Sequence, residues 1–199
     1  MKTKKTKRVS TIDKGGIEMS YIPTKDLCYA LKDHYCNADK AEKIIINCAL
    51  VAAGADAVAG IIPGIAIPAT IVACFGSVWV MYGKLCKTLG ITLSEKILKL
   101  LARAALANIA ANLGSVFIAM FAGMMFPGTS LAASAVTAFV TVYLAGMIFL
   151  QLILKLAEQS KDPYSFKDIS TDEFKKGVEN TKVGREDLEA ARKIYQENK

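Results

Sequence analysis

Residues 104–154 have the sequence AALANIAANLGSVFIAMFAGMMFPGTSLAASAVTAFVTVYLAGMIFLQLIL and contain no Lys, Arg, Asp or Glu. The pair Pro127–Gly128 divides this stretch into two apolar runs, 104–126 and 128–154. Each run is long enough for a transmembrane helix, because about 20 apolar residues at ~1.5 Å rise cross a hydrocarbon layer of roughly 30 Å. The stretch therefore predicts a helical hairpin in a membrane.

A second hairpin of the same kind is predicted upstream. Residues 44–62 and 65–82 are apolar apart from one carboxylate, Asp56, and the pair Pro63–Gly64 separates them. Shifting the sequence by 64 positions lays residues 61–83 over 125–147. Besides the Pro-Gly pairs, the matches are Ala69 with Ala133, Val72 with Val136, Phe75 with Phe139 and Val78 with Val142. Matches three residues apart lie along one side of a helix, which favours a duplicated hairpin over agreement by composition alone.

We therefore expect an all-α fold with four long apolar helices, arranged as two repeated transmembrane hairpins. The predicted layout is a basic flexible tail (1–23), an amphipathic helix (24–43), a four-helix membrane domain (44–158, with hairpins 44–90 and 94–158), and a polar linker with a charged C-terminal helix (159–199). A hydrophobic content of 53% and a mean hydropathy of +0.33 are high for a soluble protein.

The basic residues predict the topology. The net charge of +7 is concentrated in the N-terminal tail and in the connection between the hairpins. The connection carries Lys84, Lys87, Lys96, Lys99 and Arg103. The predicted hairpin turns contain Pro63, Gly64, Pro68, Pro127 and Gly128 and carry no charge. The positive-inside rule then predicts a multi-pass protein of the cell (inner) membrane with both termini cytoplasmic. This distribution favours a lipid bilayer as partner and no nucleic acid.

Asp56, Asn108 and Asn112 are the polar side chains of the apolar runs that we single out as candidates for a role. A carboxylate in a span costs roughly 2.5–3.5 kcal/mol, so Asp56 should face protein or water, either as a tie to another helix or as part of an ion path. Asn108 and Asn112 share a helix face and predict an interhelical hydrogen-bond pair, with pore lining as the alternative. Small residues such as Ala55 and Ala59 suit close helix packing and a homo-oligomer.

The ends of the predicted helices carry recognisable signals. Thr92 with Glu95, and Ser170 with Glu173, have the spacing of capping boxes. Trp79 and Tyr82 lie near the basic connection, where aromatic side chains favour the headgroup region. Residues 185–198 predict a charged helix with a narrow apolar stripe, suited to docking on a partner. The stripe consists of Leu188, Ala191 and Tyr195.

Sites for chemistry are not predicted. Cys28, His34 and Cys36 are close in sequence, but their spacing does not put them on one helix face, so we expect no metal. Five cysteines without framework spacing indicate a reducing compartment. The sequence lacks phosphate-loop, nucleophile-elbow and HExxH motifs. We expect no enzyme and no cofactor.

The central region resembles a known family. Leu89–Gly90 followed by ITLSE (91–95), an Ala/Asn-rich helix, a Pro-Gly turn and the spacing Thr141 to Gly146 are similar to the DUF697 domain, which is related to the UPF0283/YcjF proteins. The resemblance covers residues 44–158. It implies a membrane-associated helical module that serves a dynamin-like or Era-like GTPase. The family tends to have an acidic residue and a Gln after the first Pro, whereas residues 65–77 are uncharged and lack Gln.

The sequence thus predicts a non-enzymatic integral membrane module that oligomerises and serves as anchor or effector for a cytoplasmic partner, a GTPase by resemblance. Two alternatives stay open. Inserted hairpins can assemble into a channel or pore, and Ala-rich helices can also bury one another in a soluble helical-bundle interaction protein.

Overall fold

The computed structural model describes residues 24–59, 66–124, 130–160, 162–166 and 169–199. Within these ranges, the side chains of residues 56–73 and 115–133 are not described. Over these residues the chain is helical, which confirms the all-α class. The helices are α1 (Thr24–Leu31), the short 3-10 helix η1 (Ala38–Lys40), α2 (Ala41–Ala59), α3 (Ala66–Leu89), α4 (Glu95–Met124), α5 (Ser130–Gln159), α6 (Thr171–Glu179) and α7 (Arg185–Asn198). The amphipathic segment predicted as one unit over 24–43 is divided among α1, η1 and the start of α2.

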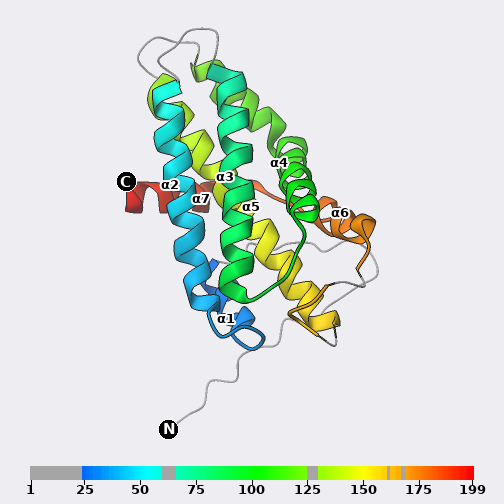
Figure 1. The fold of residues 1–199 in the computed structure, drawn as a ribbon. Helices are drawn as coiled ribbons and strands as arrows, with labels where there is room; N and C mark the ends of the chain where they lie inside the picture. The colour runs from blue at the N-terminus through cyan, green and yellow to red at the C-terminus, as the bar shows by residue number, and fades with distance from the viewer. Residues whose placement is uncertain (1–23, 60–65, 125–129, 161, 167–168) are drawn as a thin grey trace.

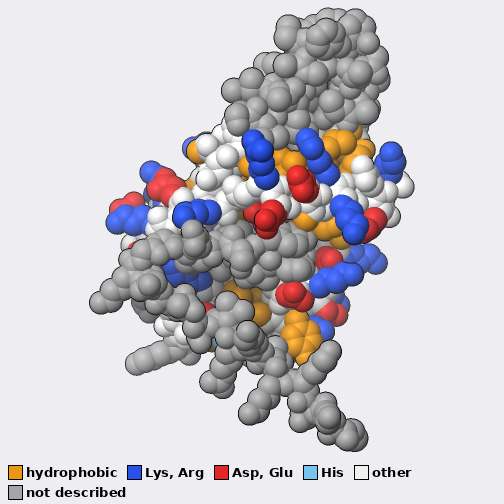
Figure 2. Space-filling view, turned by 180° about the vertical axis from the view of Figure 1, so that it is seen from behind, with side chains coloured by type: hydrophobic (Ala, Val, Ile, Leu, Met, Phe, Trp, Pro, Cys, Tyr) orange, Lys and Arg blue, Asp and Glu red, His pale blue; other side chains and the backbone are white. Residues whose placement is uncertain are grey.

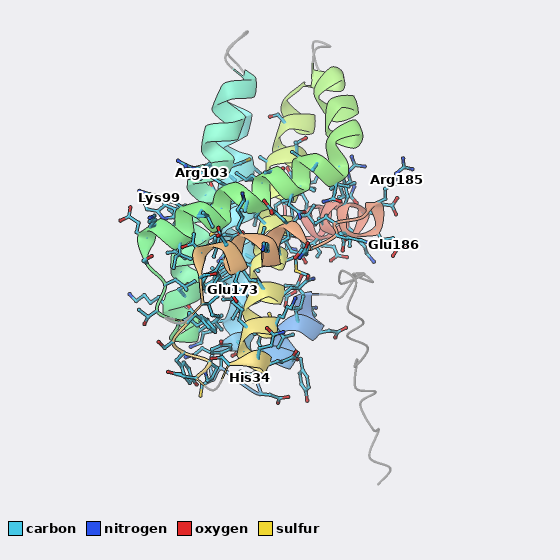
Figure 3. All side chains as sticks on the ribbon, turned by 90° about the vertical axis from the view of Figure 1, so that its right-hand side faces the viewer. His34, Lys99, Arg103, Glu173, Arg185 and Glu186 are labelled. Atoms are coloured by element: carbon cyan, nitrogen blue, oxygen red, sulfur yellow. The ribbon has the colours of Figure 1, made fainter. Side chains whose placement is uncertain are left out.

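Helices α2 and α3 stand side by side and α5 runs obliquely behind them (Figure 1), while the first part of α4 lies across this bundle (Figure 3). Further along, α4 bends and continues in the upright direction (Figure 1, Figure 3). The most extensive helix contact joins α2 to α5. Gly146 allows this approach, because a Cβ at that position would lie 2.8 Å from Cγ1 of the fully buried Ile45. The predicted hairpin partners, α2 with α3 and α4 with α5, also pack on each other.

Tyr82 lies in the core of this bundle. Its ring stacks on Phe149 with 4.4 Å between centroids, and its hydroxyl donates a hydrogen bond of 2.9 Å to the carbonyl of Ala145. Only 1% of the residue is exposed, so the prediction that it sits at a headgroup layer is wrong. A buried phenol needs a hydrogen-bond partner, and the α5 backbone supplies it.

The N-terminus of α4 differs from the predicted capping box. Ser94 precedes the helix, and its Oγ accepts a 3.3 Å hydrogen bond from the amide of Ile97. Thr92 lies two residues further out and pairs with Ser165 in an isolated parallel bridge. The prediction failed because Ser94 occupies the position whose hydroxyl can reach the free amides of the first turn.

The C-terminal region is part of the same core. The capping box of α6 is confirmed, since Ser170 Oγ accepts from the Glu173 amide (3.2 Å) while Glu173 Oε2 accepts from the Ser170 amide (2.8 Å). Helix α7 forms as predicted, but Leu188 and Ala191 are buried and α7 packs on α5. The apolar stripe predicted for a partner is therefore used within the chain.

Candidate functional site

Two stretches of the described residues are long and apolar enough to cross a membrane: Glu95–Gly114 in α4 and Ser134–Gln159 in α5. They differ in burial, because 33% of the α4 window and 89% of the α5 window lie inside the protein. Four transmembrane helices were predicted. By length and composition, the described residues support two candidates.

Asn108 is buried and holds the end of α6. Its Nδ2 donates to the carbonyls of Val178 (2.8 Å) and Thr181 (2.8 Å), with a third contact of 3.1 Å to Glu179. The last carbonyls of a helix lack i+4 amide partners within that helix, and the Asn108 amide supplies a donor to them; the Val178 carbonyl also accepts from the Thr181 amide at 3.1 Å. The predicted interhelical bond therefore runs from α4 to α6, a connection that the sequence spacing does not reveal.

Asn112 supports this arrangement from one turn along α4. Its Nδ2 donates to the carbonyl oxygen (2.9 Å) and to the side-chain Oδ1 (3.0 Å) of Asn108. The second bond fixes the orientation of the Asn108 side-chain amide. Its Oδ1 accepts from Asn112, so its Nδ2 points toward α6. The two residues predicted to act as a pair thus form one hydrogen-bonded unit.

The other polar and turn residues are only partly described. Asp56 belongs to α2, but its side chain lies outside the described residues. Pro68 falls in the first turn of α3, as predicted, and its side chain is also outside them. Pro63, Gly64, Pro127 and Gly128 all lie outside the described residues.

The basic connection is formed by the last turns of α3 and the first turns of α4. Lys84, Lys87 and Lys96 are exposed. Lys99 pairs with Glu95 at 2.6 Å and lies 4.8 Å from the centre of the Trp79 ring, while the Arg103 guanidinium lies 5.8 Å from the Phe75 ring. We call Phe75, Trp79, Lys99 and Arg103 the collar; Figure 3 labels its two basic members. Cations over aromatic faces are attracted by the ring quadrupole.

Toward the turns, the outer faces of α2 and α3 lose their charge. On α2 the exposed residues Lys43, Asn47 and Val51 follow one another at four-residue spacing, and Val51 is 69% exposed. On α3, Lys84 is exposed, and Val80 lies four residues from it in the direction of the hairpin turn. Val80 is 49% exposed. Both exposed valines lie on the turn side of the last exposed lysine of their helix.

The cysteine–histidine segment has a structural role. Burial raises the pKa of the Cys28 thiol to about 11, whereas Cys36 is exposed. Tyr35 Oη donates to the carbonyl of Pro163 (2.7 Å), and Tyr164 Oη donates to the carbonyl of His34 (3.1 Å). The described residues contain no group of three or more His, Cys, Asp or Glu placed to hold a metal ion. These contacts attach the α1–α2 connection to the loop after α5.

Comparison with known proteins finds similarity to a membrane transport subunit. A protein named Na(+)/H(+) antiporter subunit G1, from two strains of Staphylococcus epidermidis, is 31% identical over 117 residues. The match covers 58% of this chain and 98% of that subunit. No known family profile and no solved structure matches the chain. The relative and the two apolar helices indicate a membrane location. The DUF697 resemblance and the GTPase partner remain predictions.

Proposed function

Because this chain belongs to the family of the Na(+)/H(+) antiporter subunit G1, we propose that it is a helical membrane subunit that acts by packing against partner proteins, without catalysis of its own. The observation that carries the proposal is the extent of the match, since nearly the whole length of the relative, 98%, is covered. By analogy with the relative's name, the partner is a cation-transporting membrane protein.

The outer face of α2 is the surface best suited to such packing. Val51, Gly54 and Ala55 are all exposed there. Helices in lipid gain no hydrophobic driving force from associating, because lipid tails are as apolar as the helix surfaces. They associate instead through close packing, which small residues allow. A Cβ at Gly54 would have no neighbour within 4 Å, so this position is open to a second helix. The same face suits a homo-oligomer or a different subunit.

Co-purification of the full-length chain from its native membrane tests this proposal. We expect it to sediment with membranes and to purify in mild detergent with a multi-spanning cation-transport protein. Gly54→Leu should abolish that association while the chain still folds. Gly83→Leu on α3 is the matched control, because a Cβ there also has no neighbour within 4 Å. A chain that stays in the soluble fraction would refute the proposal.

Asp56 is the residue through which such a subunit would affect ions. It is the only charged residue in residues 44–83, so in a membrane it requires a partner group, water or protonation. Asp56→Asn keeps the shape and removes the charge. We expect it to reduce cation-dependent proton transport by the assembled complex, and unchanged transport would limit the subunit to a structural role.

The charged outer faces of α6 and α7 favour a second candidate, an anchor for a soluble partner such as the GTPase that the DUF697 resemblance implies. Exposed Glu186 and Glu189 on α7 offer a surface for it. Deleting α7 is not a usable test, because Leu188 and Ala191 belong to the core. Charge reversal at Glu186 and Glu189 should release a nucleotide-binding partner from the purified complex if this candidate is correct.

A further inference from the structure

We infer that the protein enters the membrane from one side only, with the turn-side ends of α2–α5 in one leaflet and the rest of the molecule in water. This inference rests on the proposed membrane location and specifies how it is achieved. It replaces helices that cross the bilayer with helix ends that enter it.

The two apolar candidates run in different directions in this fold, so they are not both aligned with one bilayer normal. Spanning helices tilt by about 20° on average and by at most roughly 40° from the bilayer normal. The first part of α4, where the candidate Glu95–Gly114 begins, lies across the direction of α5 (Figure 3). If α5 is aligned with the normal, this part of α4 lies closer to the plane of the membrane than to the normal.

Most of α5 is also excluded from hydrocarbon by the helices that cover it. Tyr195 of α7 packs on Phe139, with 5.1 Å between ring centroids. Thr24 of α1 hydrogen-bonds to Tyr143, and α6 approaches so closely that a Cβ at Gly177 would be 2.6 Å from Leu152. The contacts therefore extend along α5 from Phe139 to Leu152.

The outer faces of these covering helices are charged. Exposed residues include Lys25 and Asp26 on α1, Asp172, Glu173, Lys175 and Lys176 on α6, and Arg185, Glu186, Glu189 and Lys193 on α7. Figure 2 shows basic and acidic side chains intermixed over the described surface of one face. Each charge costs several kcal/mol in hydrocarbon, so α5 from Phe139 onward lies in the water-exposed part.

The position of Asn108 shows which part of α4 lies at the boundary between hydrocarbon and water. Its amide binds the end of α6, whose outer face is charged, so this level of α4 also lies outside the hydrocarbon. The uncharged stretch that begins after Arg103 continues through residues 115–133, which include the turn-side end of α4. The collar lies on the first part of α4 and on α3, and pairs aromatic rings with basic groups as membrane interfaces do.

The length of the uncharged helix ends fits one leaflet. Residues 115–124 of α4 and 66–73 of α3 extend about 15 and 12 Å at ~1.5 Å per residue. The hydrocarbon layer is roughly 30 Å thick, so these ends reach about its middle. The four helix ends point the same way from the body, which lets them enter together (Figure 1).

Single-cysteine variants of the full chain in sealed vesicles of phosphatidylethanolamine and phosphatidylglycerol test the inference. The native cysteines are replaced by Ser or Ala, and Met124→Cys at the end of α4 is compared with Glu189→Cys on α7. We expect an impermeant maleimide to label Glu189→Cys from one side only and to leave Met124→Cys unlabelled from either side. An environment-sensitive dye attached at position 124 before reconstitution should be quenched by lipids spin-labelled deep in the acyl chain.

Each other outcome has a distinct meaning. Labelling of Met124→Cys from the side opposite Glu189→Cys means that α4 crosses the bilayer, which overturns this inference and leaves the membrane subunit intact. If the protein does not float with the vesicles, the proposed function itself fails. Lys99→Glu with Arg103→Glu provides a second measurement: it should reduce flotation with the anionic vesicles and spare Glu189→Cys labelling, and unchanged flotation would contradict the collar as the membrane boundary.

Discussion

Helices α4 and α5 each have 30 residues and share the uncharged stretch 104–154, but they occupy opposite environments. Helix α5 is contacted by α1, α2, α3, α4, α6 and α7, and 89% of its apolar window is buried. The window of α4 is 33% buried, and Ala107, Ala110 and Ala111 remain exposed. The comparison teaches that hydropathy measures the need for an apolar environment and does not say whether protein or lipid supplies it.

The largest loss of unfolding free energy is expected from a substitution that disrupts the core around α5. Gly146→Leu places a Cβ 2.8 Å from Ile45, and the rest of the leucine has to displace that buried side chain. We expect a loss of about 3 kcal/mol or more in unfolding free energy, measured by denaturant titration in detergent. Gly114→Leu in α4 is the control, since a Cβ there has no neighbour within 4 Å. Equal losses at both positions would contradict the different packing of the two helices.

The next effect separates α6 from α4. Asn108→Ala removes the donor to the Thr181 carbonyl and leaves the Val178 carbonyl with the Thr181 amide as its remaining donor. We expect a loss of about 2 kcal/mol, because unsatisfied buried groups carry the full cost of desolvation. Hydrogen exchange should increase in α6 and stay unchanged in α7. Asn112→Ala should have a smaller effect, since Asn112 only orients the Asn108 side chain, and a larger one would reverse these assigned roles.

A smaller effect concerns the attachment of α3 to α5. Tyr82→Phe keeps the stacked ring and removes the buried hydroxyl that donates to Ala145, which should reduce unfolding free energy by about 1 kcal/mol. Tyr164→Phe removes a similar bond to the carbonyl of His34 at an exposed site. It should leave the unfolding free energy nearly unchanged. A similar loss of unfolding free energy in both variants would contradict the view that the buried hydrogen bond contributes more than the exposed one.

The smallest effect is on the cap of α6. Hydrogen bonds from the backbone amide and then the hydroxyl of Ser170 lower the pKa of Glu173 below its usual value. The folded state therefore favours the ionised carboxylate of Glu173. The stabilisation that this carboxylate gives the folded state is fully present above the ordinary glutamate pKa of about 4.3, and it is lost as the pH falls through the lowered pKa. The difference in unfolding free energy between wild type and Glu173→Gln should shrink between pH 7 and pH 3. A difference that stays constant with pH would contradict the role of the ionised carboxylate.

Local signals were sufficient for the ends of some helices and insufficient for others. Ser170 and Glu173 form the predicted capping box because both partners belong to one turn. Thr92 was the wrong cap for α4, since Ser94 also offers a hydroxyl and only the path of the chain decides which one meets the first amides. Tyr82 was assigned to an interface because its ring is amphipathic, whereas the carbonyl of Ala145, 63 positions away, provides a buried partner.

The candidate site shows the same division. Asn108 was recognised as unusual, because a carboxamide in an apolar helix requires a hydrogen-bond partner. Its partner, the end of α6, was missed, since nothing in the spacing of residues 108 and 112 identifies a helix 70 positions away. The basic residues of the collar and the nearby Trp79 were predicted, whereas the contacts of Lys99 with the Trp79 ring and of Arg103 with the Phe75 ring follow from the packing of α3 against α4.

The sequence by itself determined the all-helical class, the charge-free stretch 104–154 and the charged helix at 185–198, because these depend on residue type and on periodicity within one segment. Only the tertiary structure decided that α5 is covered by protein, that the first part of α4 lies across the bundle, and that the stripe of α7 is used internally. The physical reason is that burial is a property of neighbours. An apolar face gains the same free energy against lipid, against a partner or against another helix of its own chain, and only the path of the chain selects among them.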